Sequence, residues 1–187
     1  MNQKIKIWPY TSIIMILVFN FSCKKSSIDI GDSYNGGIVA YILQSGDIGY
    51  DANVQHGIIA APSDQSNGIQ WFNGIYKVTG ASGVAIGSGN ANTNAIVLSQ
   101  GTGSYAAMLC YDLELGGYSD WYLPSIGELN KLLLNKTIIG GFAAGDYWSS
   151  SEVDDARVQD LEFGNLHQTN YTDLKIHTHF VRAVRSF

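Results

Sequence analysis

The sequence predicts one α+β domain of mixed short strands and two or three short helices, because strand-like segments stand at both ends and helical patterns lie between them. Residues 36–43 and 56–62 are apolar runs bounded by turn residues, which is typical of strands. Residues 95–133 place apolar side chains at helical spacing, whereas residues 177–187 alternate in side-chain character as a strand does. No internal repeat is present, so these elements belong to a single fold.

The N-terminal segment has the pattern of a lipoprotein signal peptide. Lys4 and Lys6 precede an apolar run at residues 13–21, and Cys23 follows almost at once. This order predicts cleavage before Cys23 and lipidation of its side chain. The run is too short to favour a transmembrane helix. The alternative is an ordinary cleaved signal peptide that leaves Cys23 as a free thiol. The chain is therefore divided into a signal peptide (1–22), a polar tether (23–33) and a single domain (34–187).

The charge of the mature chain limits its partners. Loss of Lys4 and Lys6 would leave 9 of the 11 Lys and Arg residues against 16 Asp and Glu residues, a net charge of −7. Binding to nucleic acid or to sulfated polyanions needs clustered positive charge, because neutralising phosphate or sulfate groups supplies most of the affinity. We expect neither class of partner.

The first half of the domain is expected to consist of strands and loops. Residues 69–74 have the character of a third short strand after the two apolar runs. Residues 45–55 between those runs form a hairpin-like loop. Residues 79–94 are rich in Gly, Ser and Asn, which predicts an irregular surface loop.

Two short helices are expected from residue 95 onward, the second within residues 104–115. A third helix begins at a capping box, since Ser125 and Glu128 have the spacing at which the serine oxygen and the carboxylate each accept a backbone N–H. Pro124 keeps the residue before it extended. An apolar stripe then predicts three buried side chains: Leu129, Leu132 and Leu133. Cys110, in the second helix, is expected to be a buried core residue.

The C-terminal part is predicted to return to strands. The segment 147–151 precedes a hairpin whose turn lies around Gly164 and Asn165, and residues 177–187 form one terminal strand. Arg182 and Arg185 fall on opposite sides of that strand because their positions differ in parity. We expect one of them to pair with Glu128 or with an acidic residue in the segment 152–162.

Several separated motifs are similar to one known family. "DWYLPSIGEL", "YWSSS", a glycine hairpin and the closing "VRAVRSF" resemble the C-terminal domain family of the Legionella collagen-like protein, in the form found in Bacteroidetes lipoproteins. The resemblance spans residues 31–187 and implies a variant of the C-type lectin-like fold, in exported or surface proteins with adhesion or ligand-binding roles. Its signature positions, which we interpret as structural, are Trp121, Pro124, Ser125, Glu128, Trp148, Arg182 and Arg185.

The candidate ligand-binding residues are an aromatic ring with nearby amides. Trp71 and Asn73 lie together in a polar neighbourhood, and Asn90 lies in the Gly- and Asn-rich segment. Sugars stack their C–H faces on aromatic rings while amides bond their hydroxyl groups, so these three residues are our candidates. The alternative is that such rings fill the core, which we favour for Trp121 and Trp148.

No metal or other cofactor is predicted. The Glu-Pro-Asn and Trp-Asn-Asp motifs of calcium-dependent lectins are absent from the sequence. The acidic segment 152–160 is either a weak calcium site or a solvated loop. His177 and His179 would share one face of a strand, but the sequence offers no third zinc ligand.

The function predicted from these features is that of an exported, lipid-anchored, non-enzymatic adhesion or ligand-binding lipoprotein. No catalytic motif with a nucleophile, a base and an oxyanion donor is present, so no catalytic residue is predicted. We expect a glycan or a surface protein as partner, and the envelope of a Bacteroidetes-like bacterium, at its outer membrane, as location. The alternatives are an exported glycan-active hydrolase with a loop carboxylate site, and a structural cell-surface domain.

Overall fold

The computed structural model describes Met1, residues 27–164 and residues 170–187, and it shows an α+β architecture with two sheets. The four-stranded sheet is antiparallel throughout, in the order β1-β2-β3-β9. The five-stranded sheet has the order β4-β8-β5-β6-β7, and in it β5 and β8 are parallel. The strands are β1 (Ser33–Tyr34), β2 (Gly37–Ile42), β3 (Gly57–Ala60), β4 (Ser66–Gln70), β5 (Asp146–Glu152), β6 (Arg157–Glu162), β7 (Asn170–Leu174), β8 (Thr178–Val181) and β9 (Val184–Ser186).

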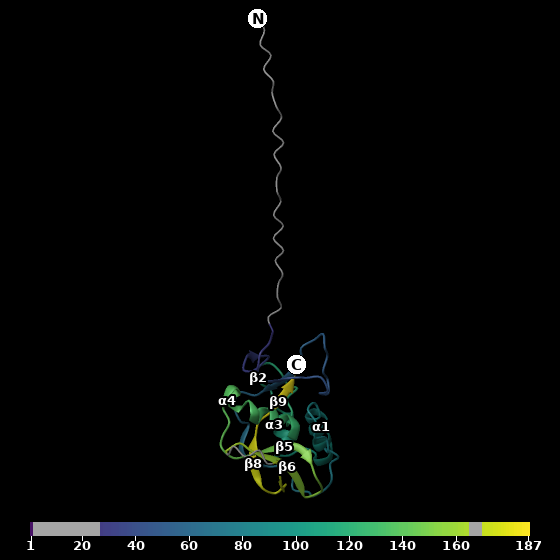
Figure 1. Cartoon of the computed structure of the whole chain (residues 1–187). Coiled ribbons are helices and arrows are strands. Elements are labelled where there is room, and N and C mark those ends of the chain that lie inside the picture. The colour runs from purple at the N-terminus through teal and green to yellow at the C-terminus, as the bar shows by residue number, and fades with distance from the viewer. Residues whose placement is uncertain (2–26, 165–169) are drawn as a thin grey trace.

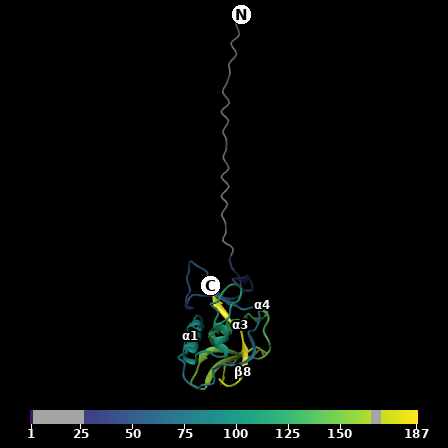
Figure 2. The ribbon, with the colours of Figure 1, turned by 180° about the vertical axis from the view of Figure 1, so that it is seen from behind.

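The four helices of the described residues lie between β4 and β5 in the chain, and together they contact strands of both sheets. They are α1 (Gly89–Gln100), α2 (Ala106–Tyr111), α3 (Ile126–Leu134) and α4 (Lys136–Ile139). Helix α1 packs on α2 and β5, whereas α3 packs on β2, β5 and β6. Figures 1 and 2 show β5 and β8 at the end of the domain opposite the first described residues of the N-terminal region. None of the helices in the described residues is long and apolar enough to cross a bilayer.

The buried apolar side chains form two clusters. One gathers around Trp71 and Trp148 with the inner faces of α1 and α2, and it contains Cys110. The other gathers around α3 with Tyr147 and β9. Cys110 is buried, as expected, and burial strongly raises the pKa of its thiol, so the side chain is a packing residue rather than a nucleophile.

The beginning of α3 confirms the capping box. Ser125 Oγ accepts the Glu128 backbone N–H at 3.3 Å, and Glu128 Oε2 accepts the Ser125 N–H at 2.7 Å. The predicted leucine stripe is buried: Leu129, Leu132 and Leu133. Pro124 is also buried, and its carbonyl accepts the Ser150 N–H, which ties the start of the helix to β5.

The prediction of a loop over residues 79–94 is wrong in its second part, because α1 begins at Gly89. Tertiary contacts support this polar helix. Asn92 donates to the Gly83 carbonyl at 2.6 Å and accepts the Gly83 N–H at 3.0 Å, so its amide bonds the preceding loop instead of competing with the helix backbone. Gly89 lies so close to α3 that a Cβ there would overlap the Glu128 carboxylate. A local reading of residue types misses both contacts.

Two predicted strands have different bounds in the structure. The predicted strand 69–74 is β4, which ends at Gln70, so Trp71 turns inward beyond the strand. The single terminal strand predicted over residues 177–187 is two strands, β8 and β9, which belong to different sheets. The break falls at Arg182 and Ala183, where the chain passes from the five-stranded sheet to the four-stranded one. Alternation in sequence continues across such a crossover and cannot reveal it.

The domain begins earlier than the predicted boundary at residue 34. Ile28 exchanges backbone bonds with the Gln55 side chain, with the Gln55 amide 2.6 Å from the Ile28 carbonyl. The Gly31 N–H donates to the Val39 carbonyl at 2.8 Å, just before β1. Residues 28–33 are therefore part of the fold rather than of a tether. Cys23 lies outside the described residues, and so do residues 24–26.

The predicted hairpin after β5 is confirmed by strand pairing. Strand β6 pairs with β7 in antiparallel register, with Leu161 opposite Asn170. Gly164 follows the end of β6, and Asn165 lies outside the described residues.

Candidate ligand-binding site

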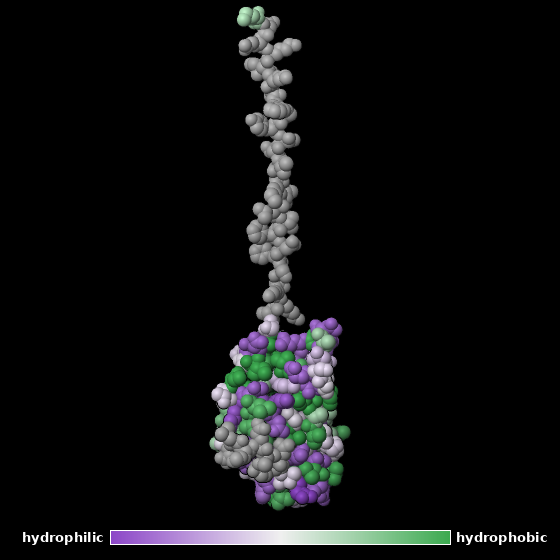
Figure 3. Space-filling model, viewed as in Figure 1, coloured by the Kyte–Doolittle hydropathy of each residue, from purple (hydrophilic) through white to green (hydrophobic). Residues whose placement is uncertain are grey.

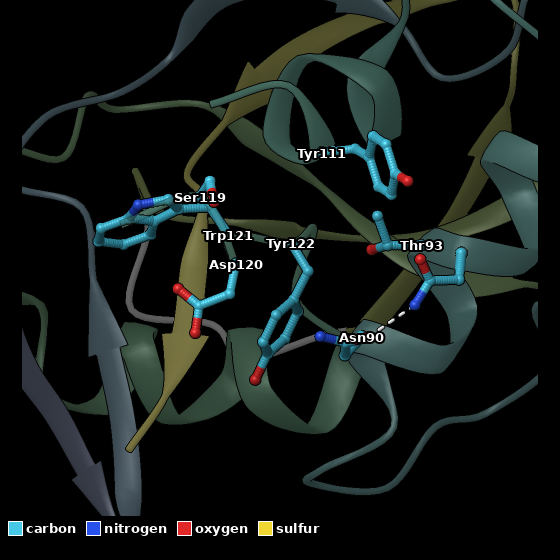
Figure 4. Close-up of a pocket in the computed structure, with 8 residues that line it drawn as sticks. Asn90, Thr93, Tyr111, Ser119, Asp120, Trp121 and Tyr122 are labelled. Atoms are coloured by element: carbon cyan, nitrogen blue, oxygen red, sulfur yellow. Dashed lines mark hydrogen bonds between the residues drawn. The ribbon is translucent and has the colours of Figure 1, made fainter. Parts of the chain in front are cut away.

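A pocket of about 280 Å³ lies where α1 meets the segment before α3 and the end of α2 (Figure 4). Its volume is slightly below the range of about 300–1,000 Å³ for small-ligand pockets in proteins. The lining residues come from three separate parts of the chain: Asn90, Thr93, Asn94, Tyr111, Ser119, Asp120, Trp121 and Tyr122.

Helix α1 contributes amide groups from one of its faces. Asn90 and Asn94 are four residues apart, and Asn94 Nδ2 donates to Asn90 Oδ1 at 2.7 Å. Figure 4 shows Asn90 beside Tyr122. On the same helix, Thr93 Oγ1 accepts the Leu123 N–H at 3.0 Å, which fixes α1 against the segment before α3. The exposed Asn90 and Asn94 side chains remain at the pocket with an N–H₂ group and a carbonyl oxygen to offer a ligand.

The inner wall consists of two aromatic side chains held in place by hydrogen bonds. Trp121 Nε1 donates to the Leu115 carbonyl, and the Tyr122 hydroxyl donates to Glu128 Oε1 at 3.2 Å. Each of these rings is only 2% exposed, so they shape the pocket without offering a face for stacking. Burial raises the pKa of the Glu128 carboxyl, although bonds from backbone N–H groups and hydroxyls oppose that rise.

Tyr111 is the exposed aromatic residue of the site. It ends α2, and 48% of its surface is exposed. Its ring therefore stands at the pocket rather than in the core, and Figure 4 shows it on the side of Thr93. An exposed ring beside amides is the combination that suits the C–H faces and hydroxyl groups of a sugar.

The charged group of the pocket is Asp120, which is fixed by Arg185. Arg185 Nε and Nη2 donate to the two carboxylate oxygens at 2.7 and 2.8 Å, a bidentate geometry. The Tyr118 ring covers the guanidinium at 3.8 Å, and Arg185 Nη1 donates to the Asn35 carbonyl. The hydrogen bond from Arg185 holds the pKa of Asp120 below its usual value. Asp120 is therefore an ionised acceptor at neutral pH.

The predicted partners of the two arginines were wrong. Arg185 binds Asp120, and the fully buried Arg182 donates through Nε to Asp64 at 2.8 Å. Arg182 also donates to the carbonyls of Ala61, Gly140 and Gly141. The acidic partners of both arginines therefore lie outside the segment 152–162, and neither of them is Glu128.

Trp71 is not available to a ligand, contrary to the prediction. Its side chain is 0% exposed, and its Nε1 donates to the Ser149 carbonyl at 2.8 Å. Because β4 ends at Gln70, the chain turns and carries the indole into the core. Trp148 is buried in the same cluster, and its Nε1 donates to the Ile69 carbonyl at 2.7 Å. This position agrees with the prediction that Trp148 fills the core.

The other two predicted ligand residues lie at different places. Asn73 is exposed, but its amide donates to the Gln100 and Thr102 carbonyls at the C-terminal end of α1. Asn90 lies at the N-terminal end of the same helix and lines the pocket. The structure therefore separates the predicted trio and keeps only Asn90 at the site. If α1 had been predicted to begin at Gly89, Asn94 would also have been a candidate, because it lies one turn after Asn90. No local sequence signal identifies Tyr111 or Asp120 as a pocket residue.

Two acids of the segment 152–160 form ion pairs within the fold. Glu152 binds Lys175 at 2.6 Å, and Asp154 binds Arg157 at 2.7 Å. His177 and His179 both contact Asp173. Across residues 27–164 and 170–187, no group of three or more His, Cys, Asp or Glu side chains is arranged to hold a metal ion.

Comparison with known proteins shows a similarity of fold. No protein-family model matches the chain, and no curated protein sequence matches it. Among solved structures, the chain is similar to a fimbrial protein from Bacteroides ovatus ATCC 8483, with a TM-score of 0.57 and 15% sequence identity. The match covers 84% of this chain and 48% of the fimbrial protein, so this chain spans about half the length of that protein. At this level of identity, the similarity is one of fold.

Proposed function

We propose that the protein is a non-enzymatic cell-surface domain of the adhesion type, which binds a neutral, hydroxyl-rich ligand such as a glycan in the pocket between α1 and the segment 119–122. The observation that carries this proposal is the pocket's set of groups, which joins two exposed amides, an exposed tyrosine ring and a fixed carboxylate. The fimbrial protein of similar fold supports a surface role. A C-type lectin-like fold and a lipid at Cys23 are part of the proposal.

The electrostatics of the pocket favour a neutral ligand. Asp120 is its charged lining residue, and the positive charge of Arg185 is directed at Asp120 and covered by Tyr118. An acidic sugar or a sulfated chain would meet an ionised carboxylate without a free cation to bind it. The hydroxyl groups of a neutral sugar can instead donate to Asp120 and to Asn94 while accepting from Asn90.

The same geometry argues against glycoside hydrolysis. Glycosidases use a pair of carboxyl groups, one of which must hold a proton as general acid. The described residues that line this pocket include a single carboxylate, Asp120. Arg185 lowers its pKa, which makes it a poor proton donor at neutral pH.

An anchor at Cys23 would hold the domain close to a membrane. Ile28 is already bonded to Gln55, so four residues would lie between the lipidated Cys23 and the fold, a span of five residue steps. An extended chain reaches ~3.3–3.6 Å per residue, which limits the separation to roughly 17 Å. The fold would then project outward with the five-stranded sheet at its far end (Figure 1).

Binding by pocket variants tests the proposal. We expect the wild-type protein to bind neutral glycans on an array and to show negligible retention of sulfated chains. Tyr111→Ala and Asn90→Ala should each weaken that binding by about fivefold, since one lost contact costs about 1 kcal/mol. Tyr76→Ala is the matched control, because Tyr76 is 46% exposed and belongs to the segment bound to the other end of α1.

The outcomes separate the alternatives. Equal loss of glycan binding in all three variants, or no loss of binding in the two pocket variants, would contradict the proposed site. Release of sugar products by the wild-type protein would favour the hydrolase instead.

A further inference from the structure

Asp160, in the middle of the five-stranded sheet, is a buried acid without a partner for one of its oxygens. The residue is 3% exposed. Within the described residues, its Oδ1 atom is buried and has no hydrogen-bond partner. Most buried polar atoms in proteins are bonded, so an orphaned carboxylate oxygen in a sheet requires an explanation. The pocket site does not include this residue.

The pairing of the strands places two more acids beside it. Asp160 on β6 is opposite Trp148 on β5, and Asp146 lies two residues before Trp148 on the same face. On the other side, Asp173 of β7 is opposite Val158, two residues before Asp160. Both acids therefore occupy diagonal positions to Asp160, at about 7–8 Å between backbone positions.

Two histidines complete the group. His179 of β8 contacts the Trp148 ring, with centroids 3.8 Å apart, and its Nε2 lies 2.9 Å from an Asp173 oxygen. His177, in the turn before β8, contacts the same carboxylate at 2.8 Å. Both imidazoles are thus directed at Asp173 and leave the Asp160 oxygen unpartnered. The sheet curls so that β7 and β8, which are not neighbours in its order, meet through these contacts.

Among the residues that the structure describes, the other neighbours do not supply a counter-charge. Glu162, on the same face of β6, is itself acidic and is opposite Asp146. Strand β4 contains no charged residue. Helix α3 packs on the opposite face of β6, where Leu161 shares a cluster with Leu129. A metal ion is not indicated either, since the described side chains form no suitable ligand group. A bound proton neutralises the Asp160 carboxylate and takes up less space than any other cation.

We propose that a cluster of five side chains forms a proton-operated clamp, which holds the β6–β7 hairpin in one protonation state and loosens it in the other. The cluster consists of Asp160, Asp146, Asp173, His177 and His179. The clamp holds the hairpin while Asp160 is protonated and loosens it when Asp160 becomes a carboxylate between two others. Strand β7 is the outer strand of the sheet in the described chain, so it is the element that responds.

The pKa values agree with this geometry. Burial, followed by the charges of Asp146 and Asp173, raises the pKa of Asp160 to about 7. The folded protein therefore retains a proton that the unfolded chain loses near pH 4. The contribution of Asp160 to folding stability is fully present below the pKa that this carboxyl has in the unfolded chain. It falls as the pH rises toward about 7. Burial lowers the pKa of His179, and this has the opposite effect on the pH dependence of stability. Below pH 6.5 the imidazole binds a proton more readily in the unfolded chain than in the fold, so acid lowers the folding stability.

Comparison with Asp160→Asn isolates the proposed group, because His179 is present in both proteins. We expect the variant to equal the wild type in Tm at about pH 4 and below, and to exceed it progressively as the pH rises toward about 7. Hydrogen exchange, corrected for the intrinsic effect of pH, should show loss of β7 protection in the wild type alone. Asp155→Asn is the control, since Asp155 is an exposed acid on the neighbouring β5–β6 turn and should leave the pH profile unchanged.

A Tm difference that is constant across the pH range, or a variant that follows the wild type throughout, would overturn the clamp. A direct measurement covers the case in which the variant fails to fold. Carboxyl carbon NMR of the wild-type protein should show Asp160 titrating near pH 7, and titration near pH 4 would overturn the proposal equally.

Discussion

Replacing Trp71 with alanine is expected to destabilise the domain by about 3–5 kcal/mol, the range for truncation of a large buried aromatic side chain. The indole is fully buried in the cluster that joins α1, α2 and the five-stranded sheet. The substitution would remove these contacts and leave the Ser149 carbonyl without its 2.8 Å bond. It would also uncover Lys175, whose ammonium group lies 4.7 Å from the ring centroid.

Chemical denaturation measures this loss, and Trp71→Phe provides a graded comparison. Phenylalanine keeps most of the apolar contact but removes the N–H donor, so its destabilisation should be intermediate. A Trp71→Ala variant that unfolds at the wild-type denaturant concentration would contradict the buried position of the ring.

Breaking the pair between Lys175 and Glu152 is expected to cost about 3–5 kcal/mol for either single substitution, because a buried charge would then lack its partner. Both side chains are buried, and Nζ lies 2.6 Å from Glu152 Oε1. The ammonium group also donates to the Asp155 and Lys77 carbonyls, so all three of its protons are used. On the other side, Glu152 accepts bonds from Thr79 and Gly80.

A double-mutant cycle distinguishes the pair from its surroundings. We expect Lys175→Met and Glu152→Gln each to be severely destabilised, and the double variant to be more stable than the sum of the two losses implies. Additive losses would mean that the two charges do not act on each other.

The sequence revealed those elements whose signals are local. The cap at Ser125 and Glu128 and the leucine stripe of α3 follow from spacing within one turn or two, and the structure shows both. Helix α1 was partly missed because its first residues are glycine and asparagine. Asn92 is bonded to Gly83 in the preceding loop, and Gly89 packs closely against Glu128, which is far from it in sequence.

The site was harder to predict than the fold elements for the same reason. Trp71 has polar neighbours in sequence, but its burial is decided by the end of β4 and by packing against Lys175. Asn90 was identified from residue type alone. The residues it meets, Tyr111 and Asp120, come from segments that only the tertiary fold brings to α1. The arginine pairs likewise depend on a strand crossover that alternation does not show.

Amide NMR during titration with a neutral glycan identified on an array is the most direct test of the proposed site. The side-chain amides of Asn90 and Asn94 and the indole N–H of Trp121 should shift in a saturable manner, while the buried Trp71 indole serves as an internal reference. Saturable shifts at these pocket groups, with little change at Trp71, are the result we predict. Shifts confined to residues outside the pocket, with the two asparagine amides unmoved, would contradict the account.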